Sequence, residues 1–343
     1  DSGQLGDGTK AERASPVQVV GMSGVSGLSA GFLRSAVVKT DGTVWGWGNN
    51  AFGQLGDGTK VTRTSPVQTV GLVNVTALAS GFYHTVALKN DGTIWAWGSN
   101  SYNQLGDGTT INRAVPVRVA GLAEIIGIGP SVALKSDGSV WIWGSSLGET
   151  SAETLPIAVQ EPNLSGVQAI AANSHALALK YDGSLLAWGY NESGQLGDGT
   201  LTNRETAVKV KELKNVVSVS AGGYFSVASK SDGTVWEWGN KYNGPVTPVK
   251  IDGINYITLV AAGQYHTVAL KNDGTVWCWG ENTAGQLGNG TTDQPAAREM
   301  VDGMENVVAV AAGDDHTVAL RADGTVSGWG SNDVGQLGDW GSD

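Results

Sequence analysis

The chain has 343 residues, 41% of them hydrophobic, and carries 51 glycines but only 9 prolines, a composition typical of a globular protein rich in turns. Its formal net charge of −11 and the lack of any Lys or Arg run argue against nucleic-acid binding, so we expect no nucleic-acid partner. The single cysteine, Cys278, excludes an internal disulfide framework, and no apolar run approaches the length of a membrane span, so membrane insertion is not expected.

A Trp-Gly pair that follows an Asp-Gly turn divides the chain into seven similar segments. The tryptophans of these pairs lie 50, 46, 45, 50, 41 and 50 residues apart: Trp47, Trp97, Trp143, Trp188, Trp238, Trp279 and Trp329. Self-similarity at this spacing indicates one supersecondary unit copied around an axis. Because the repeat leaves no linker between segments, we expect residues 1–343 to form a single domain.

Each segment predicts four strands, as residues 260–301 illustrate. An apolar run and an alternating run give two strands, and Asn272-Asp273-Gly274 then predicts a hairpin turn before the strand that ends in Trp279-Gly280. After a longer loop, a short run ending at Val301 supplies the fourth strand. In other segments this run begins with proline, which suits an outer edge strand.

Seven such units without helical periodicity predict an all-β fold, a seven-bladed β-propeller of four-stranded antiparallel blades. Residues 16–20 are a fourth-type strand, whereas residues 307–329 supply three strands and lack a fourth. We therefore expect 16–20 to complete the blade of 307–329 and close the ring. The element at 3–7 recurs at 335–339, which leaves one terminal copy redundant. That copy is expected to hang free, to pack on top of the ring or to dock into another molecule, and self-association through the termini is one form of the last alternative.

The repeat resembles a known family. Residues 263–270, with Asp273-Gly274, Trp279-Gly280 and Gly285-Gln286-Leu287-Gly288, are similar to the regulator of chromosome condensation repeat, and the resemblance covers essentially the whole chain. It implies the seven-bladed fold, of a bacterial type. Eukaryotic members of the family are nucleotide exchange factors for a small GTPase and bind chromatin. Secreted bacterial members grip and inhibit β-lactamases with aromatic loop residues, and this acidic chain without a basic tail resembles that mode of binding.

The histidines and the glycine-rich loops have structural explanations. His84, His175, His266 and His316 occupy one position of the repeat, so we expect each to brace its own loop through a backbone hydrogen bond. The Leu-Gly-Asp-Gly-Thr loops contain the residues that turns require, and their spacing fits neither a calcium loop nor a P-loop. No nucleophile motif is present. We expect no enzyme activity, no catalytic residues, no metal and no cofactor.

Phenylalanine and tyrosine gather in two sets of loops that emerge on the same face of an antiparallel blade. They precede the second strand or follow the Trp-Gly strand: Phe32, Phe82, Tyr83, Tyr224, Phe225 and Tyr265, and Phe52, Tyr102, Tyr190 and Tyr242. Such a concentration is typical of an interface hot spot, although sideways packing between loops is the alternative. We expect these rings, with Arg34, Asp314 and Asp315, to bind a protein partner whose surface is positive or mixed.

Two segments depart from the repeat. The third lacks the Gly-x-x-His loop after Ile128-Gly129-Pro130, and both the loop at 145–155 and the loop at 241–246 lack the Gln-Leu-Gly element. The shortened loops either form a notch in the rim or mark simple degeneration.

These observations predict a noncatalytic protein-interaction module that binds its partner through an aromatic-rich loop face. Near-identical repeats, such as 3–10 and 53–60, favour an extracellular or cell-surface bacterial protein. Two alternatives stay open. One is a secreted enzyme inhibitor similar in binding mode to the β-lactamase-inhibitory propellers, and the other is a guanine nucleotide exchange factor-like regulator or an enzyme.

Overall fold

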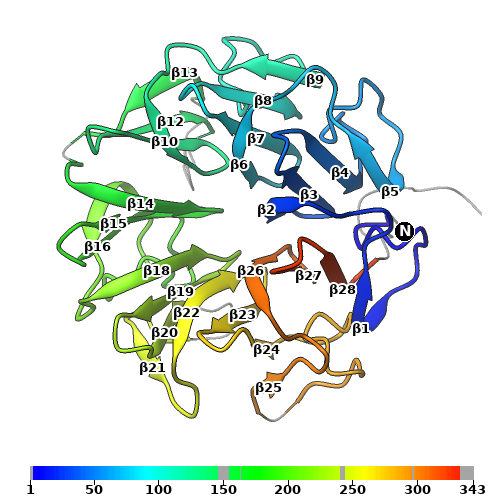
Figure 1. Cartoon of the computed structure of the whole chain (residues 1–343). Coiled ribbons are helices and arrows are strands. Elements are labelled where there is room, and N and C mark those ends of the chain that lie inside the picture. The colour runs from blue at the N-terminus through cyan, green and yellow to red at the C-terminus, as the bar shows by residue number, and fades with distance from the viewer. Residues whose placement is uncertain (1–2, 146–153, 163, 240–243, 296, 333–343) are drawn as a thin grey trace, which may run out of the picture.

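The computed structural model describes residues 3–145, 154–162, 164–239, 244–295 and 297–332. Over these residues, 28 strands form seven four-stranded antiparallel sheets arranged in a ring around a central axis (Figure 1). The predicted seven-bladed propeller is therefore confirmed. No helix of sufficient length and apolarity to cross a membrane occurs in this part of the chain.

The blades are numbered here from the N-terminus, so that blade 1 contains β2 to β5 and blade 7 contains β26 to β28 together with β1. The innermost strands are β2 (Val25–Ala30), β6 (Val75–Ser80), β10 (Ile125–Ile128), β14 (Val167–Ala172), β18 (Val216–Ala221), β22 (Ile257–Ala262) and β26 (Val307–Ala312). The second strands are β3 (Arg34–Lys39), β7 (His84–Lys89), β11 (Val132–Lys135), β15 (His175–Lys180), β19 (Phe225–Lys230), β23 (His266–Lys271) and β27 (His316–Arg321).

The third strands, which end in the Trp-Gly pairs, are β4 (Val44–Gly48), β8 (Ile94–Gly98), β12 (Val140–Gly144), β16 (Leu185–Gly189), β20 (Val235–Gly239), β24 (Val276–Gly280) and β28 (Val326–Gly330). The outer strands are β5 (Arg63–Gln68), β9 (Arg113–Arg118), β13 (Leu155–Gln160), β17 (Arg204–Lys209), β21 (Val249–Ile251), β25 (Glu299–Met300) and β1 (Arg13–Gln18). Each sheet follows chain order except the closing sheet, β1-β28-β27-β26.

The N-terminus closes the ring. Strand β1 pairs with β28 and covers residues 13–18, so it begins three residues before the predicted 16–20 strand and ends two residues before it. Ahead of it, the Leu5 N–H donates to Asn332 Oδ1 at 3.0 Å, and Gln4 Nε2 donates to Ser331 Oγ at 3.2 Å. The N-terminal copy of the Gln-Leu-Gly element thus occupies the loop position that follows β28. The second copy, at 335–339, lies outside the described residues.

The core lies between neighbouring blades. Six of the Trp-Gly tryptophans are at most 2% exposed: Trp47, Trp97, Trp143, Trp188, Trp238 and Trp329. The leucine of each Gln-Leu-Gly element among the described residues is buried to the same extent: Leu5, Leu55, Leu105, Leu196 and Leu287. Clusters of these residues draw side chains from two consecutive blades, so burial of apolar surface holds the blades to one another.

One backbone carbonyl in each Gln-Leu-Gly loop joins two blades. The carbonyl of Gln4 accepts hydrogen bonds from Ser35 Oγ at 2.9 Å and from Trp47 Nε1 at 2.7 Å, both in the next blade. The same pair of bonds recurs at Gln195, with Ser226 and Trp238, and at Gln286, with Thr317 and Trp329. We call this contact the latch. It satisfies an indole N–H and a hydroxyl that the tight packing between blades excludes from water.

The histidines also contact the next blade, so the expectation that each braces its own loop is wrong. The Nε2 atom of His316 lies 3.0 Å from Ser35 Oγ, a latch hydroxyl in the next blade. The same contact joins His266 to Thr317 and His175 to Ser226. Burial lowers the pKa of these rings, to about 4 at His84 and His266 and to about 3 at His175 and His316.

The buried histidines predict that acid destabilises the propeller. The unfolded chain has histidine pKa values near the usual ~6.5, so between about pH 6.5 and pH 4 it binds more protons than the folded chain does. The free energy of unfolding therefore falls as the pH is lowered through that window, by at most about 1.4 kcal/mol per pH unit for each histidine. Replacing two of the four, with His175→Gln and His316→Gln, should remove about half of the histidine contribution to this slope, measured by urea unfolding across the window. A slope unchanged by the double substitution would contradict the account.

Candidate functional site

The predicted loop sets lie at one end of the ring. Phe52, which follows β4, and Tyr83, which precedes β7, have ring centroids 5.1 Å apart, so the two kinds of loop meet. We define the loop face by its described aromatic residues: Phe32, Phe52, Phe82, Tyr83, Tyr102, Tyr190, Tyr224, Phe225 and Tyr265. The remaining predicted aromatic, Tyr242, lies outside the described residues.

The aromatic rings of the loop face form two groups. In blades 1 and 2, the ring of Phe32 lies 5.7 Å from that of Phe82 and 5.8 Å from that of Tyr83. In blades 5 and 6, Tyr224 and Tyr265 stack at 5.3 Å with an angle of 11° between their planes. Some rings of the loop face thus pack against their neighbours, yet Phe82 remains 43% exposed and Tyr102 remains 62% exposed.

Arg34, which was predicted to contact a partner, is buried between two blades. Its side chain is buried at 1% exposure, where Nε donates to Thr85 Oγ1 at 3.1 Å and the two Nη groups donate to the carbonyls of Phe82 and His84. These acceptors belong to blade 2. Arg34 therefore occupies the place that a histidine takes in four other blades and joins blade 1 to blade 2, so it is not an exposed contact for a partner.

Asp314 and Asp315 place acidic groups near the centre of the loop face. Asp314, one of the predicted partner contacts, is buried at 7% exposure, whereas Asp315 is half-buried. Burial and the neighbouring Asp315 raise the pKa of Asp314 to about 7, against the lowering effect of Arg34. Burial, Glu281 and Glu12 raise the pKa of Asp315 to about 6.

The aspartates of the Leu-Gly-Asp-Gly-Thr loops bind their own loops. Asp57 Oδ1 accepts hydrogen bonds from the backbone and hydroxyl of Thr59, and Asp57 Oδ2 pairs with Arg63 at 2.7 Å. The same ion pair recurs between Asp7 and Arg13, Asp107 and Arg113, and Asp198 and Arg204. These carboxylates thus support the turn, which is the structural explanation that the sequence favoured.

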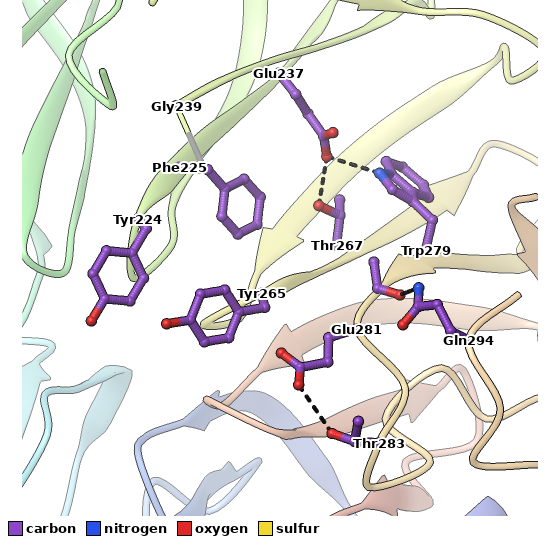
Figure 2. A pocket seen from close by; sticks show the side chains of 11 residues that line it. Tyr224, Phe225, Glu237, Gly239, Tyr265, Thr267, Trp279, Glu281, Thr283 and Gln294 are labelled. Atoms are coloured by element: carbon purple, nitrogen blue, oxygen red, sulfur yellow. Dashed lines mark hydrogen bonds between the residues drawn. The ribbon is translucent and has the colours of Figure 1, made fainter. Parts of the chain in front are cut away.

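A cavity of about 500 Å³ opens between blades 5 and 6, at the position of one shortened loop. Figure 2 shows the rings of Tyr224, Phe225 and Tyr265 along one side of it, with Trp279 and Gln294 across from them. The shortened loops at 145–155 and 241–246 lie partly outside the described residues, which omit 146–153 and 240–243. Two smaller cavities, of about 330 and 290 Å³, lie beside Phe82 on the same face.

Glu237, on β20, lies against this cavity, and the sequence analysis did not single it out. Its Oε1 accepts a hydrogen bond from Thr267 Oγ1 at 2.6 Å and another from Trp279 Nε1 at 2.9 Å (Figure 2). Burial raises the pKa of Glu237, although these two hydrogen bonds and the charge of Arg298 oppose the rise. Trp279 is half-buried, unlike the six fully buried tryptophans of the other Trp-Gly pairs.

A comparison between repeats would have revealed Glu237. At the same position of the third strand the other blades carry small or apolar residues: Gly46, Ala96, Ile142, Ala187, Cys278 and Gly328. The single carboxylate in this series coincides with a missing Gln-Leu-Gly element.

The acidic centre of the loop face predicts an unusual titration. The carboxyl group of Asp314 should titrate with a midpoint near pH 7, because burial disfavours its charged form. Carbon-detected NMR of the side-chain carboxyl groups measures this midpoint directly. A midpoint for Asp314 near the usual aspartate pKa of about 3.9 would contradict the description. Between about pH 4 and pH 7 the folded chain holds a proton on Asp314 that the unfolded chain has lost. The contribution of Asp314 to the free energy of unfolding therefore falls as the pH rises through this window, whereas the contribution of the histidines rises.

Comparisons with known proteins place the chain in a family. Residues 125–343 match the model of the RCC1-like domain, and residues 41–88 and 91–129 match the regulator of chromosome condensation (RCC1) repeat. The RCC1 domain-containing protein RUG3, mitochondrial, of Arabidopsis thaliana is 30% identical over 93 residues. That match covers 26% of this chain and 20% of the plant protein, so it spans about a fifth of that relative's length.

Solved structures show the same fold. The crystal structure of human WBSCR16 superposes with a TM-score of 0.77 at 22% identity, over 87% of each chain. Yeast RCC1 (Prp20), solved bound to Kap60, gives a TM-score of 0.73 at 21% identity, over 90% of this chain and 80% of the yeast one. At these identities the likeness concerns the fold alone. Because the RCC1-like domain model matches more than half of the sequence, the chain belongs to the RCC1-like family of repeat propellers.

Proposed function

We propose that this chain is a noncatalytic propeller that binds a protein partner on its loop face. The observation that carries the proposal is the gathering of exposed and half-buried aromatic rings on that one face, Phe82 and Tyr102 foremost. Aromatic side chains supply large contact areas with few rotatable bonds, which is why they dominate interface hot spots. Packing among Phe32, Phe82 and Tyr83 holds the rings in place before a partner arrives and lowers the entropic cost of binding.

The charge of the loop face favours a basic partner. Asp315, Glu281 and the exposed Glu192 lie on it, whereas Arg34 is buried beneath it. Complementary charge mainly raises the association rate and the specificity, so the affinity would come from the aromatic residues.

The serine and histidine pairs support a noncatalytic role. Ser35 and His316 have the 3.0 Å spacing of a nucleophile and its base, yet both are at most 1% exposed. The hydroxyl of Ser35 donates its hydrogen bond to the Gln4 carbonyl. In a serine nucleophile the hydroxyl would instead donate that proton to the histidine. A substrate carbonyl has no route to such a hydroxyl beneath the Gln-Leu-Gly loop.

The family supports a protein as the class of partner. Yeast RCC1 was solved with Kap60, and Prp20p of Saccharomyces cerevisiae has been described with its binding properties to Gsp1p and histones. For the present chain we infer a protein partner without carrying over any of those identities. An extracellular bacterial setting, and with it the role of a secreted inhibitor, stays a proposal based on the acidic, compact repeat sequence.

Affinity capture with paired variants tests the proposal. The intact chain serves as bait beside a Phe82→Ala, Tyr102→Ala variant, whose exposed rings should cost the fold little. We expect quantitative mass spectrometry to show proteins retained by the intact chain and reduced about tenfold or more on the variant, because two exposed aromatic rings are lost.

The opposite face supplies a matched control. Tyr181, in the turn after β15, and Tyr256, just before β22, are 70% and 66% exposed. A Tyr181→Ala, Tyr256→Ala bait should capture the same proteins as the intact chain. Equal capture by all three baits, or loss on the control alone, would contradict the loop-face assignment.

A further inference from the structure

In most blades a leucine fills the space above the third strand. A Cβ atom added to Gly46 would lie 3.2 Å from Leu55 Cδ2, and one added to Gly328 would lie 3.4 Å from Leu5 Cδ2. Each of these leucines belongs to the Gln-Leu-Gly loop of the same blade. The loop therefore covers a small residue of its own blade and presents its glutamine carbonyl to the next blade.

Blade 5 lacks this cover. After β20 the chain carries no Gln-Leu-Gly element before β21, and the Gly239 N–H donates to the Pro245 carbonyl at 2.8 Å. The cavity of about 500 Å³ lies at the position that the loop takes in other blades, between β20 and the loop after β24. Glu237 stands where Gly46 stands in blade 1. Its carboxylate supplies the acceptor that Thr267 and Trp279 would otherwise find in a glutamine carbonyl.

Blade 3 lost the same element and compensates differently. Ile142 takes the strand position and is only 8% exposed, so an apolar side chain fills part of the space. In the next blade the latch hydroxyl is replaced by Ala176, and the indole N–H of Trp188 has no hydrogen-bond partner among the described residues. An apolar repair is thus available to this fold. Blade 5 instead keeps a partly dehydrated carboxylate, which costs free energy unless a positive group offsets it.

The walls of the cavity suit a cation that carries an apolar stem. Tyr224, Phe225, Tyr265 and Trp279 present aromatic surface, and Glu281 adds a second carboxylate. No lysine or arginine is among its described lining residues. The charge of Arg298 acts on Glu237 and opposes the rise of its pKa, although no ion pair within 4 Å joins these two described residues. Aromatic faces attract cations, and the long stems of lysine and arginine pack well on apolar surface.

We propose that this cavity binds a lysine or arginine side chain of the partner that docks on the loop face. The apolar stem lies along Phe225 and the Tyr224–Tyr265 stack, and the cationic head reaches the Glu237 carboxylate. That carboxylate accepts two hydrogen bonds through Oε1 and, with roughly four lone-pair sites in all, keeps capacity for a charged donor. This inference rests on the proposed function and adds the chemistry of the residue that the partner inserts.

An NMR titration tests the pocket without knowledge of the partner. Nα-acetyl-lysine methylamide and Nα-acetyl-arginine methylamide are added separately to the ¹⁵N-labelled full chain, with neutral Nα-acetyl-norleucine methylamide as the third probe. The reporter is the Trp279 indole N–H, which donates to Glu237 inside the cavity. We expect at least one cationic probe to shift this resonance saturably and the norleucine probe to leave it unchanged.

Two substitutions separate local pairing from general charge. Glu237→Gln keeps an acceptor for Thr267 and Trp279, so the fold should survive, while affinity for the cationic probe falls by about tenfold or more. Glu192→Gln removes an exposed charge from the same face and should leave that affinity almost unchanged. Equal binding of the norleucine and cationic probes, unchanged affinity after Glu237→Gln, or no saturable shift with either cation would overturn the proposal.

The capture experiment distinguishes failure of the pocket from failure of the proposed function. A Glu237→Gln bait joins the three baits described above. Partners lost on both the Glu237→Gln bait and the Phe82→Ala, Tyr102→Ala bait support both proposals. Partners lost only on the aromatic variant would leave the loop face as the binding surface and refute the pocket as the seat of a basic side chain.

Discussion

The propeller depends on one recurring contact, in which the glutamine carbonyl of a loop accepts an indole N–H and a hydroxyl from the next blade. The hydroxyl in turn meets a buried histidine of its preceding neighbour. A blade with a Gln-Leu-Gly loop therefore supplies both its own cover and an acceptor for groups of the next blade, so such a blade is not complete alone. The closing blade obeys the same rule, because Gln4 at the N-terminus follows Ser331 in space and latches onto blade 1.

Two blades that lack part of this contact carry charged side chains at positions where other blades have histidine, small or apolar residues. The arginine at position 34 replaces a histidine and keeps a buried positive charge near Asp314, whose pKa reflects both burial and that neighbour. The glutamate at position 237 replaces a small residue and substitutes for a missing carbonyl. In a nearly symmetric ring such substitutions break the equivalence of the blades. They give the sector of the loop face between blades 5 and 6 a cavity of about 500 Å³ that is lined by the Glu237 carboxylate.

The fold could be predicted from the sequence because its signals are local and periodic. Asp-Gly turns, alternating strands and the Trp-Gly period fix the number of blades, and the count of strand types at the two ends fixes ring closure. The site was harder to predict. Arg34, His84 and His266 bind groups 46 to 51 residues away in the next blade, and His316 binds Ser35 across the ring closure, so their burial cannot be read from a local pattern. Glu237 emerges only when one strand position is compared across all seven repeats, together with the loop that should cover it.

The central claim is that the cavity beside Glu237 is the vacated position of a Gln-Leu-Gly loop. Its most direct test measures the free energy of unfolding after the 190–203 loop is transplanted in place of residues 240–248 in a Glu237→Ala background. The account predicts that the transplanted chain is more stable than Glu237→Ala alone, by about 2 kcal/mol for one newly buried leucine. Equal or lower stability would show that the loop does not fit there, and would contradict the account.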